Sequence, residues 1–132
     1  MNVSPRHPPR EFAVGRTGGI RLRHCADIAL DADEQVTFVA PSGTQHDVVR
    51  KSWGYYATGS LNGRLRDHGL RGALVVNGAG RLYLLLVEQG RENEFEQYLR
   101  DEEQRLLTWL DRDDDVRRLI GLLESPEGTR DG

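Results

Sequence analysis

Two apolar runs separated by a four-residue turn constrain the fold more than any other feature of this sequence. Residues 72–76 (Gly-Ala-Leu-Val-Val) and 81–87 (Arg-Leu-Tyr-Leu-Leu-Leu-Val) flank the turn sequence Asn-Gly-Ala-Gly at 77–80. Asn and Gly supply the positive φ angles that tight hairpin turns require. Apolar residues follow one another in both runs, which is typical of strands buried on both faces. The sequence therefore predicts a hairpin whose strands lie centrally in a sheet.

Three shorter segments with strand character precede this hairpin. In residues 19–25, apolar and arginine side chains alternate with the period of two that one buried face produces. Residues 35–40 and 45–51 are rich in β-branched side chains and are joined by Pro-Ser-Gly-Thr at 41–44, a typical turn composition. The sequence thus predicts a second hairpin and about five strands in total.

Helical signals lie between the two hairpins and at the end of the chain. Thr58 or Ser60 is suited to cap a short helix that ends at Gly69. From residue 91 to residue 110 the apolar positions follow a helical stripe. The charged Glu102 falls within this stripe and marks a break in it. Three aspartates at 113–115 then favour the start of a last helix carrying Val116, Leu119, Ile120 and Leu123.

The order of these elements predicts the fold class and the domain organisation. Strands followed by helices indicate an α+β fold: an antiparallel sheet of about five strands with one short inserted helix and C-terminal helices covering a face. The length of 132 residues suits a single domain, which we place at residues 15–123. Proline and arginine dominate residues 1–14, so we predict a flexible arm there, and a disordered tail at residues 124–132.

Composition disfavours several function classes. The net charge of −3 argues against a general nucleic-acid binder. No apolar stretch approaches the roughly 20 residues of a membrane helix, so no membrane association is expected. Cys25 is the single cysteine, which excludes an internal disulfide and fits a reducing compartment, and we predict a cytoplasmic protein. The four histidines show no short-range ligand pair, so neither a metal nor a cofactor is expected.

Charge is distributed in blocks along the chain. Residues 26–47 carry a net charge of −5, residues 48–81 carry +5, and residues 82–132 carry −7. The basic block suits an anionic ligand. It is equally consistent with surface pairing between these cations and the acidic helices, in which each pair contributes little to stability.

Residues 50–65, within the basic block, combine three aromatic, three glycine, three hydroxyl and three cationic residues. Aromatic rings offer flat faces with polar tips, and a guanidinium binds carboxylate or phosphate through two hydrogen bonds. The alternative is a turn between a strand and a helix whose aromatic side chains fill the core. The candidate ligand-binding residues are Arg50, Lys51, Trp53, Tyr55, Tyr56, Thr58, Ser60, Asn62 and Arg64.

The core Trp-Gly-x-Tyr-Ala-Thr-x-Ser-x-Asn-Gly-Arg-Leu at residues 53–65 resembles a group of small uncharacterised bacterial proteins, and the likeness covers residues 19–111. Their genes accompany surface-polysaccharide or acidic-sugar loci. The resemblance implies a role in carbohydrate biosynthesis and brings no established activity with it. Gly59 stands where those proteins carry proline, which would loosen the turn.

The leading functional prediction is a non-catalytic binding or accessory protein. Its partner is either an anionic small molecule, such as an acidic sugar, a sugar nucleotide or a phosphate, or a biosynthetic enzyme. One alternative is a small enzyme acting on an anionic sugar, with Tyr55, Tyr56 or His46 as acid-base groups and Arg64 as the anchor. Another is a structural dimerisation module. We hold homodimerisation as a hypothesis because strands that are apolar on two faces need a second cover.

Overall fold

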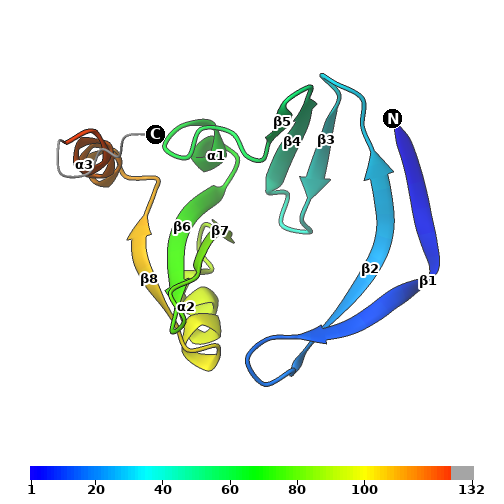
Figure 1. The fold of residues 1–132 in the computed structure, drawn as a ribbon, viewed down its shortest axis with the longest axis horizontal. Helices are drawn as coiled ribbons and strands as arrows, with labels where there is room; N and C mark the ends of the chain where they lie inside the picture. The colour runs from blue at the N-terminus through cyan, green and yellow to red at the C-terminus, as the bar shows by residue number, and fades with distance from the viewer. Residues whose placement is uncertain (126–132) are drawn as a thin grey trace.

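The computed structural model describes residues 1–125 and shows an α+β protein (Figure 1). The described part contains eight strands and three helices. In chain order they are β1 (Asn2–Val14), β2 (Ile20–Ala29), β3 (Gln35–Val39), β4 (Gln45–Lys51), β5 (Gly54–Tyr56), α1 (Arg64–Asp67), β6 (Leu70–Asn77), β7 (Leu82–Glu88), α2 (Glu92–Asp101), β8 (Gln104–Trp109) and α3 (Asp113–Glu124).

The strands form three small antiparallel sheets instead of the one sheet of about five strands that the sequence predicted. The first sheet is the hairpin β1–β2, the second has the order β3-β4-β5, and the third has the order β7-β6-β8. The α+β class, the antiparallel pairing and the short helix between the hairpins are confirmed. Figure 1 shows the hairpin β1–β2 arching along one side of the molecule, away from the third sheet.

Residues 2–14 form strand β1, whereas we expected an arm without structure. Asn2 to Pro5 pair with Ala29 to Ala26, and pairing resumes at Arg10 opposite His24. The adjacent prolines 8 and 9 lie in the irregular segment between these two paired stretches. Because the prolines fall where the ladder is already interrupted, their missing amide donors cost no inter-strand hydrogen bond. The predicted tail begins at the end of α3, and residues 126–132 lie outside the described residues.

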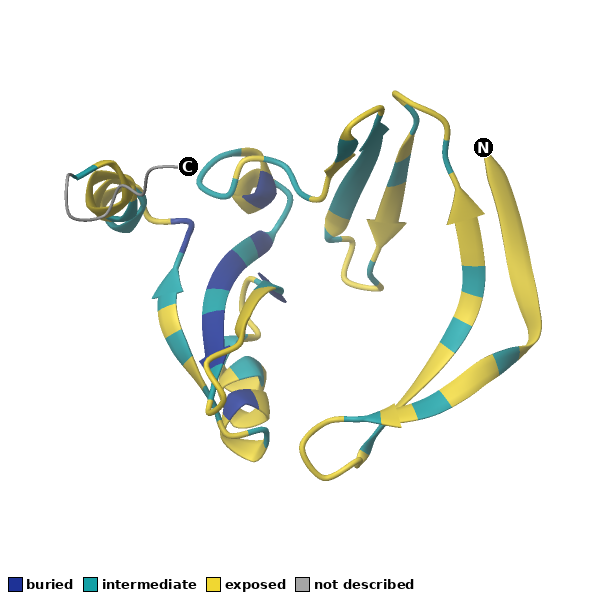
Figure 2. Cartoon of the chain, in the orientation of Figure 1, coloured by how far each residue is buried: buried dark blue, intermediate teal, exposed yellow. Residues whose placement is uncertain are grey.

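The main core lies between the third sheet and α2. Ala73, Val75, Val87 and Leu99 are buried together, and four further apolar side chains pack against them: Leu85, Phe95, Leu106 and Trp109. Figure 2 shows β6 as the most deeply buried strand of the molecule. The predicted hairpin at 72–87 is therefore confirmed, with its strands extended to β6 and β7.

Strand β7 is an edge strand, which corrects the expectation that both arms of this hairpin are central. Within the third sheet, as described, only β6 has hydrogen-bonded neighbours on both sides, namely β7 and β8. Leu82 and Leu84 of β7 are 61% and 46% exposed. The consecutive apolar residues of β7 therefore indicate a second apolar face that remains open in the described chain, and not a central position in the sheet.

Residues 104–109 form strand β8, although the sequence pattern placed them in a helix running to residue 110. Helix α2 ends at Asp101, and Glu103 adopts a left-handed conformation with φ 53° that reverses the chain. The break expected at Glu102 is thus confirmed as the C-cap of α2. Leu106 and Trp109 are three residues apart, a spacing that suits a helix and not the strand period of two. A register shift in the pairing with β6 allows both side chains to pack on the core from one strand.

Helix α1 is shorter than predicted and starts later. It spans Arg64–Asp67, and Gly69 follows it with φ +88°, as the predicted glycine stop requires. A Cβ at Gly69 would lie 2.7 Å from Thr44 Cγ2, so the position also needs the missing side chain. The last helix is confirmed as α3. None of the helices within residues 1–125 is long and apolar enough to cross a membrane.

Candidate functional site

The turn between β4 and β5 places three aromatic side chains on the surface. Trp53, Tyr55 and Tyr56 are 68%, 58% and 57% exposed. The rings of Trp53 and Tyr56 meet edge to face, with centroids 5.7 Å apart and an interplanar angle of 72°. The alternative in which these side chains fill the core is therefore wrong for all three. We call these residues, with Arg50 and Lys51, the aromatic surface.

The two cations of the aromatic surface are engaged by groups of the chain itself. The Arg50 guanidinium lies 5.3 Å from the Tyr55 ring centroid, and its Nη1 donates to the carbonyl oxygens of Lys51 and, at 3.0 Å, of Gly54. Lys51 Nζ donates to Asp33 Oδ1, and this carboxylate raises the pKa of Lys51 above its usual range. These contacts fix the cations in place and leave the aromatic rings as the most exposed part of the surface.

Arg64 lies in a different environment. Its Nη2 donates to Asp47 Oδ2 at 3.3 Å, although the Arg64 side chain is 63% exposed. The Thr37 hydroxyl donates to Asp47 Oδ1 at 2.7 Å, and this hydrogen bond, followed by Arg64, holds the pKa of Asp47 below its usual value. Arg64 also lines a cavity of about 10 Å³ with His46, His68 and Asp47, among others. A cavity of that volume holds about one water and not a sugar.

The three remaining predicted residues serve the local structure. The Thr58 hydroxyl donates to the carbonyl oxygen of Gly59 at 3.2 Å. Ser60 Oγ accepts from the amide of Arg64, the first residue of α1, at 2.8 Å. The N-cap of α1 is Gly63 and no side chain caps the helix, so the prediction that Thr58 or Ser60 is the cap is wrong. Asn62 Nδ2 donates to Asp113 Oδ1 at 3.2 Å and thereby ties the loop before α1 to the start of α3.

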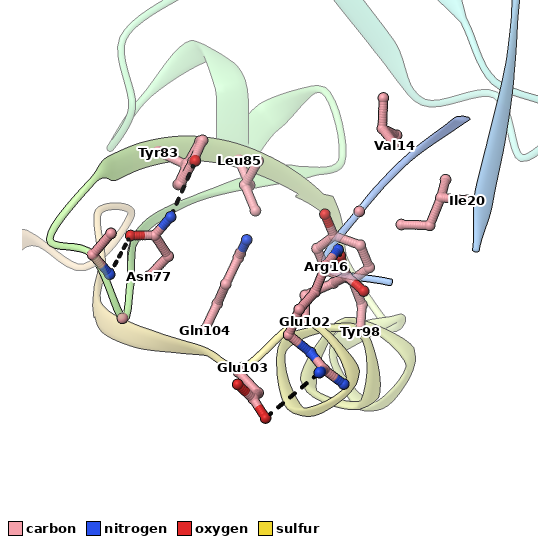
Figure 3. A pocket seen from close by; sticks show the side chains of 13 residues that line it. Val14, Arg16, Ile20, Asn77, Tyr83, Leu85, Tyr98, Glu102, Glu103 and Gln104 are labelled. Atoms are coloured by element: carbon pink, nitrogen blue, oxygen red, sulfur yellow. Dashed lines mark hydrogen bonds and ion pairs between the residues drawn. The ribbon is translucent and has the colours of Figure 1, made fainter. Parts of the chain in front are cut away.

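The sequence analysis missed a larger cavity, of about 530 Å³, between the β1–β2 turn and the third sheet with α2 (Figure 3). The turn is anchored there because the Arg16 amide donates to Glu102 Oε1 at 2.6 Å and Arg16 Nε donates to the Asp101 carbonyl at 3.1 Å. Gln104 Oε1 is buried and accepts no hydrogen bond. This oxygen has almost no accessible surface, so it is not offered to a ligand in the cavity. The two carboxylates of the cavity, Glu102 and Glu103, make it unsuited to an anion.

Another missed cluster surrounds Arg71, a cation of the basic block. Arg71 Nε donates to Asp111 Oδ2 at 2.7 Å, Nη2 donates to Asp111 Oδ1 at 3.2 Å, and Nη1 donates to Glu92 Oε2 at 3.2 Å. The guanidinium also lies 3.9 Å from the Trp109 ring centroid. Asp111 raises the pKa of Arg71 above its usual range. Pairing of the basic block with an acidic helix, one of the two alternatives, is realised by Arg71 with Glu92 of α2. Arg64 and Lys51 pair instead with Asp47 and Asp33 of the acidic block at residues 26–47.

Few contacts in the structure support the alternative prediction of a small enzyme with His46 as an acid-base group. His46 stacks on Phe38 with ring centroids 6.3 Å apart, and its Nδ1 is buried without a hydrogen-bond partner. Its strand neighbour Asp47 is engaged by Thr37 and Arg64. In residues 1–125, no group of three or more His, Cys, Asp or Glu side chains is placed to hold a metal ion.

No known family model matches the sequence, and comparison with curated proteins and with solved structures finds no match either.

Proposed function

We propose that this chain is a non-catalytic accessory protein that binds a partner protein through the aromatic surface at the β4–β5 turn. The observation that carries the proposal is the exposure of Trp53, Tyr55 and Tyr56, each with more than half of its surface in water. Trp, Tyr and Arg are the residues most often found at the energetic centres of protein interfaces. The resemblance to proteins of acidic-sugar loci suggests a biosynthetic enzyme as the partner.

The rigidity of the aromatic surface supports this role. Arg50 is held against Tyr55 and the turn carbonyls, and Trp53 packs edge to face on Tyr56. A side chain that is already ordered loses little entropy on binding, so more of its contact energy contributes to affinity. The aromatic rings project from a hairpin turn, a shape that suits insertion into a groove of a larger protein.

An anionic small molecule is the second candidate ligand. Arg50 and Lys51 lie beside the exposed rings, an arrangement that suits an anion with a flat or apolar part. The pairing of Lys51 with Asp33 and of Arg64 with Asp47 weakens this candidate, because a ligand must compete with those carboxylates. Partner binding is therefore the better supported of the two.

Site-specific photo-crosslinking in the native cells tests the partner. A photoreactive phenylalanine analogue at Trp53 is expected to trap one protein, whereas the same analogue at Val39, which is 64% exposed on β3, is not. With the purified partner, Trp53→Ala and Tyr56→Ala are expected to weaken binding at least tenfold. Equal trapping from both positions, or unchanged affinity of both variants, contradicts the proposal.

Thermal denaturation with sugar nucleotides, acidic sugars and inorganic phosphate tests the second candidate. Binding of an anion to the native protein raises the midpoint temperature. We expect the rise to be lost in Arg50→Ala and Arg64→Ala if both residues take part. A rise that survives both substitutions excludes the predicted anion site.

A further inference from the structure

The third sheet has a second apolar face that no described element covers fully. Successive residues of a strand point to opposite faces, and the register places Leu74, Val76, Leu82, Leu84 and Leu86 on the face opposite α2. The α1 loop reaches only the end of this face, where Leu61 and Leu65 lie against Gly72. We call these five residues the leucine face. On this face Leu82 and Leu84 are exposed, Leu74 and Leu86 are half-buried, and Val76 is buried.

Helix α3 has an apolar side with no surface to pack on. Val116, Leu119 and Ile120 lie on one side of the helix, yet α3 buries none of its residues, and Ile120 is 47% exposed. An isolated twelve-residue helix is marginal in water, so α3 needs an apolar surface to pack on. Figure 1 shows α3 beyond the end of β8 and apart from the sheet.

Hydrogen bonds fix the connection between β8 and α3 in a position that keeps α3 away from its own sheet. The Leu110 amide donates to the Gly72 carbonyl at 2.8 Å, and Asp111 accepts two hydrogen bonds from Arg71. Asn62 binds the Asp113 carboxylate at the first residue of the helix. Folding α3 back onto its own leucine face would require these anchors to be broken.

The surface area of the chain indicates how much cover is missing. A compact monomer of this mass, 14.9 kDa, is expected to expose about 7,000 Å². This chain exposes 9565 Å². Two chains together thus expose about 5,000 Å² more than two compact monomers, and this excess is an upper limit on the area that the proposed contact buries. The hairpin β1–β2 accounts for part of this excess, and the leucine face and α3 account for another part.

We propose that two copies of this chain form a symmetric dimer in which α3 of each copy packs on the leucine face of the other. One face of the third sheet lacks a covering helix and α3 lacks a surface to pack on, so exchange of α3 about one two-fold axis satisfies both. The proposal is independent of the aromatic surface, so either can fail without the other.

Sedimentation equilibrium of the full chain at micromolar concentration is expected to give the mass of a dimer. Leu84→Glu places a charge on the leucine face and is expected to raise the dimer dissociation constant at least tenfold. Tyr83→Glu is the matched control, since Tyr83 is the preceding residue of β7, has similar exposure and points to the opposite face. A native chain of monomer mass, or a dimer equally stable in Leu84→Glu, overturns the proposal.

Disulfide trapping identifies the contact even if a charged variant fails to fold. The exposed Cys25 is first replaced by Ser, and Leu84→Cys and Ile120→Cys are made in separate chains. Oxidation of the mixture is expected to link one chain of each kind, visible as a dimer on a non-reducing gel and as a mixed peptide in mass spectrometry. Links only between two Leu84→Cys chains, or no links, overturn the exchange of α3.

Discussion

Two regions of this protein combine tryptophan, arginine and a carboxylate, and they use the combination in opposite ways. At β6–β8 the Arg71 guanidinium lies over Trp109 and binds Asp111 and Glu92, and the Asp111 residue is only 8% exposed. At the β4–β5 turn Trp53 is 68% exposed, and Arg50 binds backbone carbonyls of its own turn. The same residue types therefore stabilise the fold at one place and remain available to a partner at the other.

Removal of Arg71 is expected to break the buried cluster with the largest effect on stability. Arg71→Ala leaves Asp111 buried without its partner, and loss of one member of a buried pair costs about 3–5 kcal/mol. Urea denaturation measures this loss. Arg64→Ala is the control, because the Arg64 side chain is 63% exposed and its pair with Asp47 contributes at most about 1 kcal/mol. Equal losses of unfolding free energy in Arg71→Ala and Arg64→Ala would mean that the buried and the exposed ion pair contribute equally to stability.

Acid is expected to weaken the buried cluster through Glu92. The Glu92 carboxylate accepts from its own amide, from Arg71 and from the Gly90 amide, and these hydrogen bonds lower its pKa in the folded protein below the usual value. A lowered folded-state pKa gives stability that is complete above the unfolded-state value and is lost as the pH falls through the folded-state value.

Urea denaturation of the native chain and of Glu92→Gln at several pH values measures this contribution. The difference in unfolding free energy between the two proteins is expected to be largest at neutral pH and to decline on acidification below pH ~4. It is expected to stay below the loss for Arg71→Ala, because Glu92 is the more exposed partner of Arg71. A difference that is the same at every pH would show that ionisation of Glu92 contributes nothing.

Elements with a clear local signal could be predicted from the sequence. The hairpin β6–β7, the hairpin β3–β4 and helix α3 each combine a hydrophobic period with a suitable turn or start. Strand β1 could not be predicted, because its prolines lack donors and its strand state depends on pairing with β2. Strand β8 could not be predicted, because Leu106 and Trp109 have helical spacing and only a register shift in the pairing with β6 places both on the core.

The candidate site, too, could be predicted from the sequence only in part. Composition singled out residues 50–65, but composition does not state which side of a hairpin faces water, so the exposure of Trp53 could not be derived. Nor did the sequence state which cation of the basic block would be buried, since Arg71 and Arg64 differ in the carboxylates, the burial and the ring contact that the fold gives them. The acidic block after residue 82 supplied the partners of Arg71, which was the one available signal.

Substitution of the two tryptophans tests the comparison between the exposed and the buried region, and it includes the smallest expected change in stability. Trp53→Ala is expected to change the unfolding free energy by no more than about 0.5 kcal/mol, because the ring is largely in water. Trp109→Ala, which removes a ring packed on Phe95 and Arg71, is expected to cost about 3 kcal/mol. Urea denaturation of both variants measures the contrast. If Trp53→Ala lowers the unfolding free energy as much as Trp109→Ala does, the exposed ring stabilises the fold. Its exposure then no longer supports a partner site at the aromatic surface.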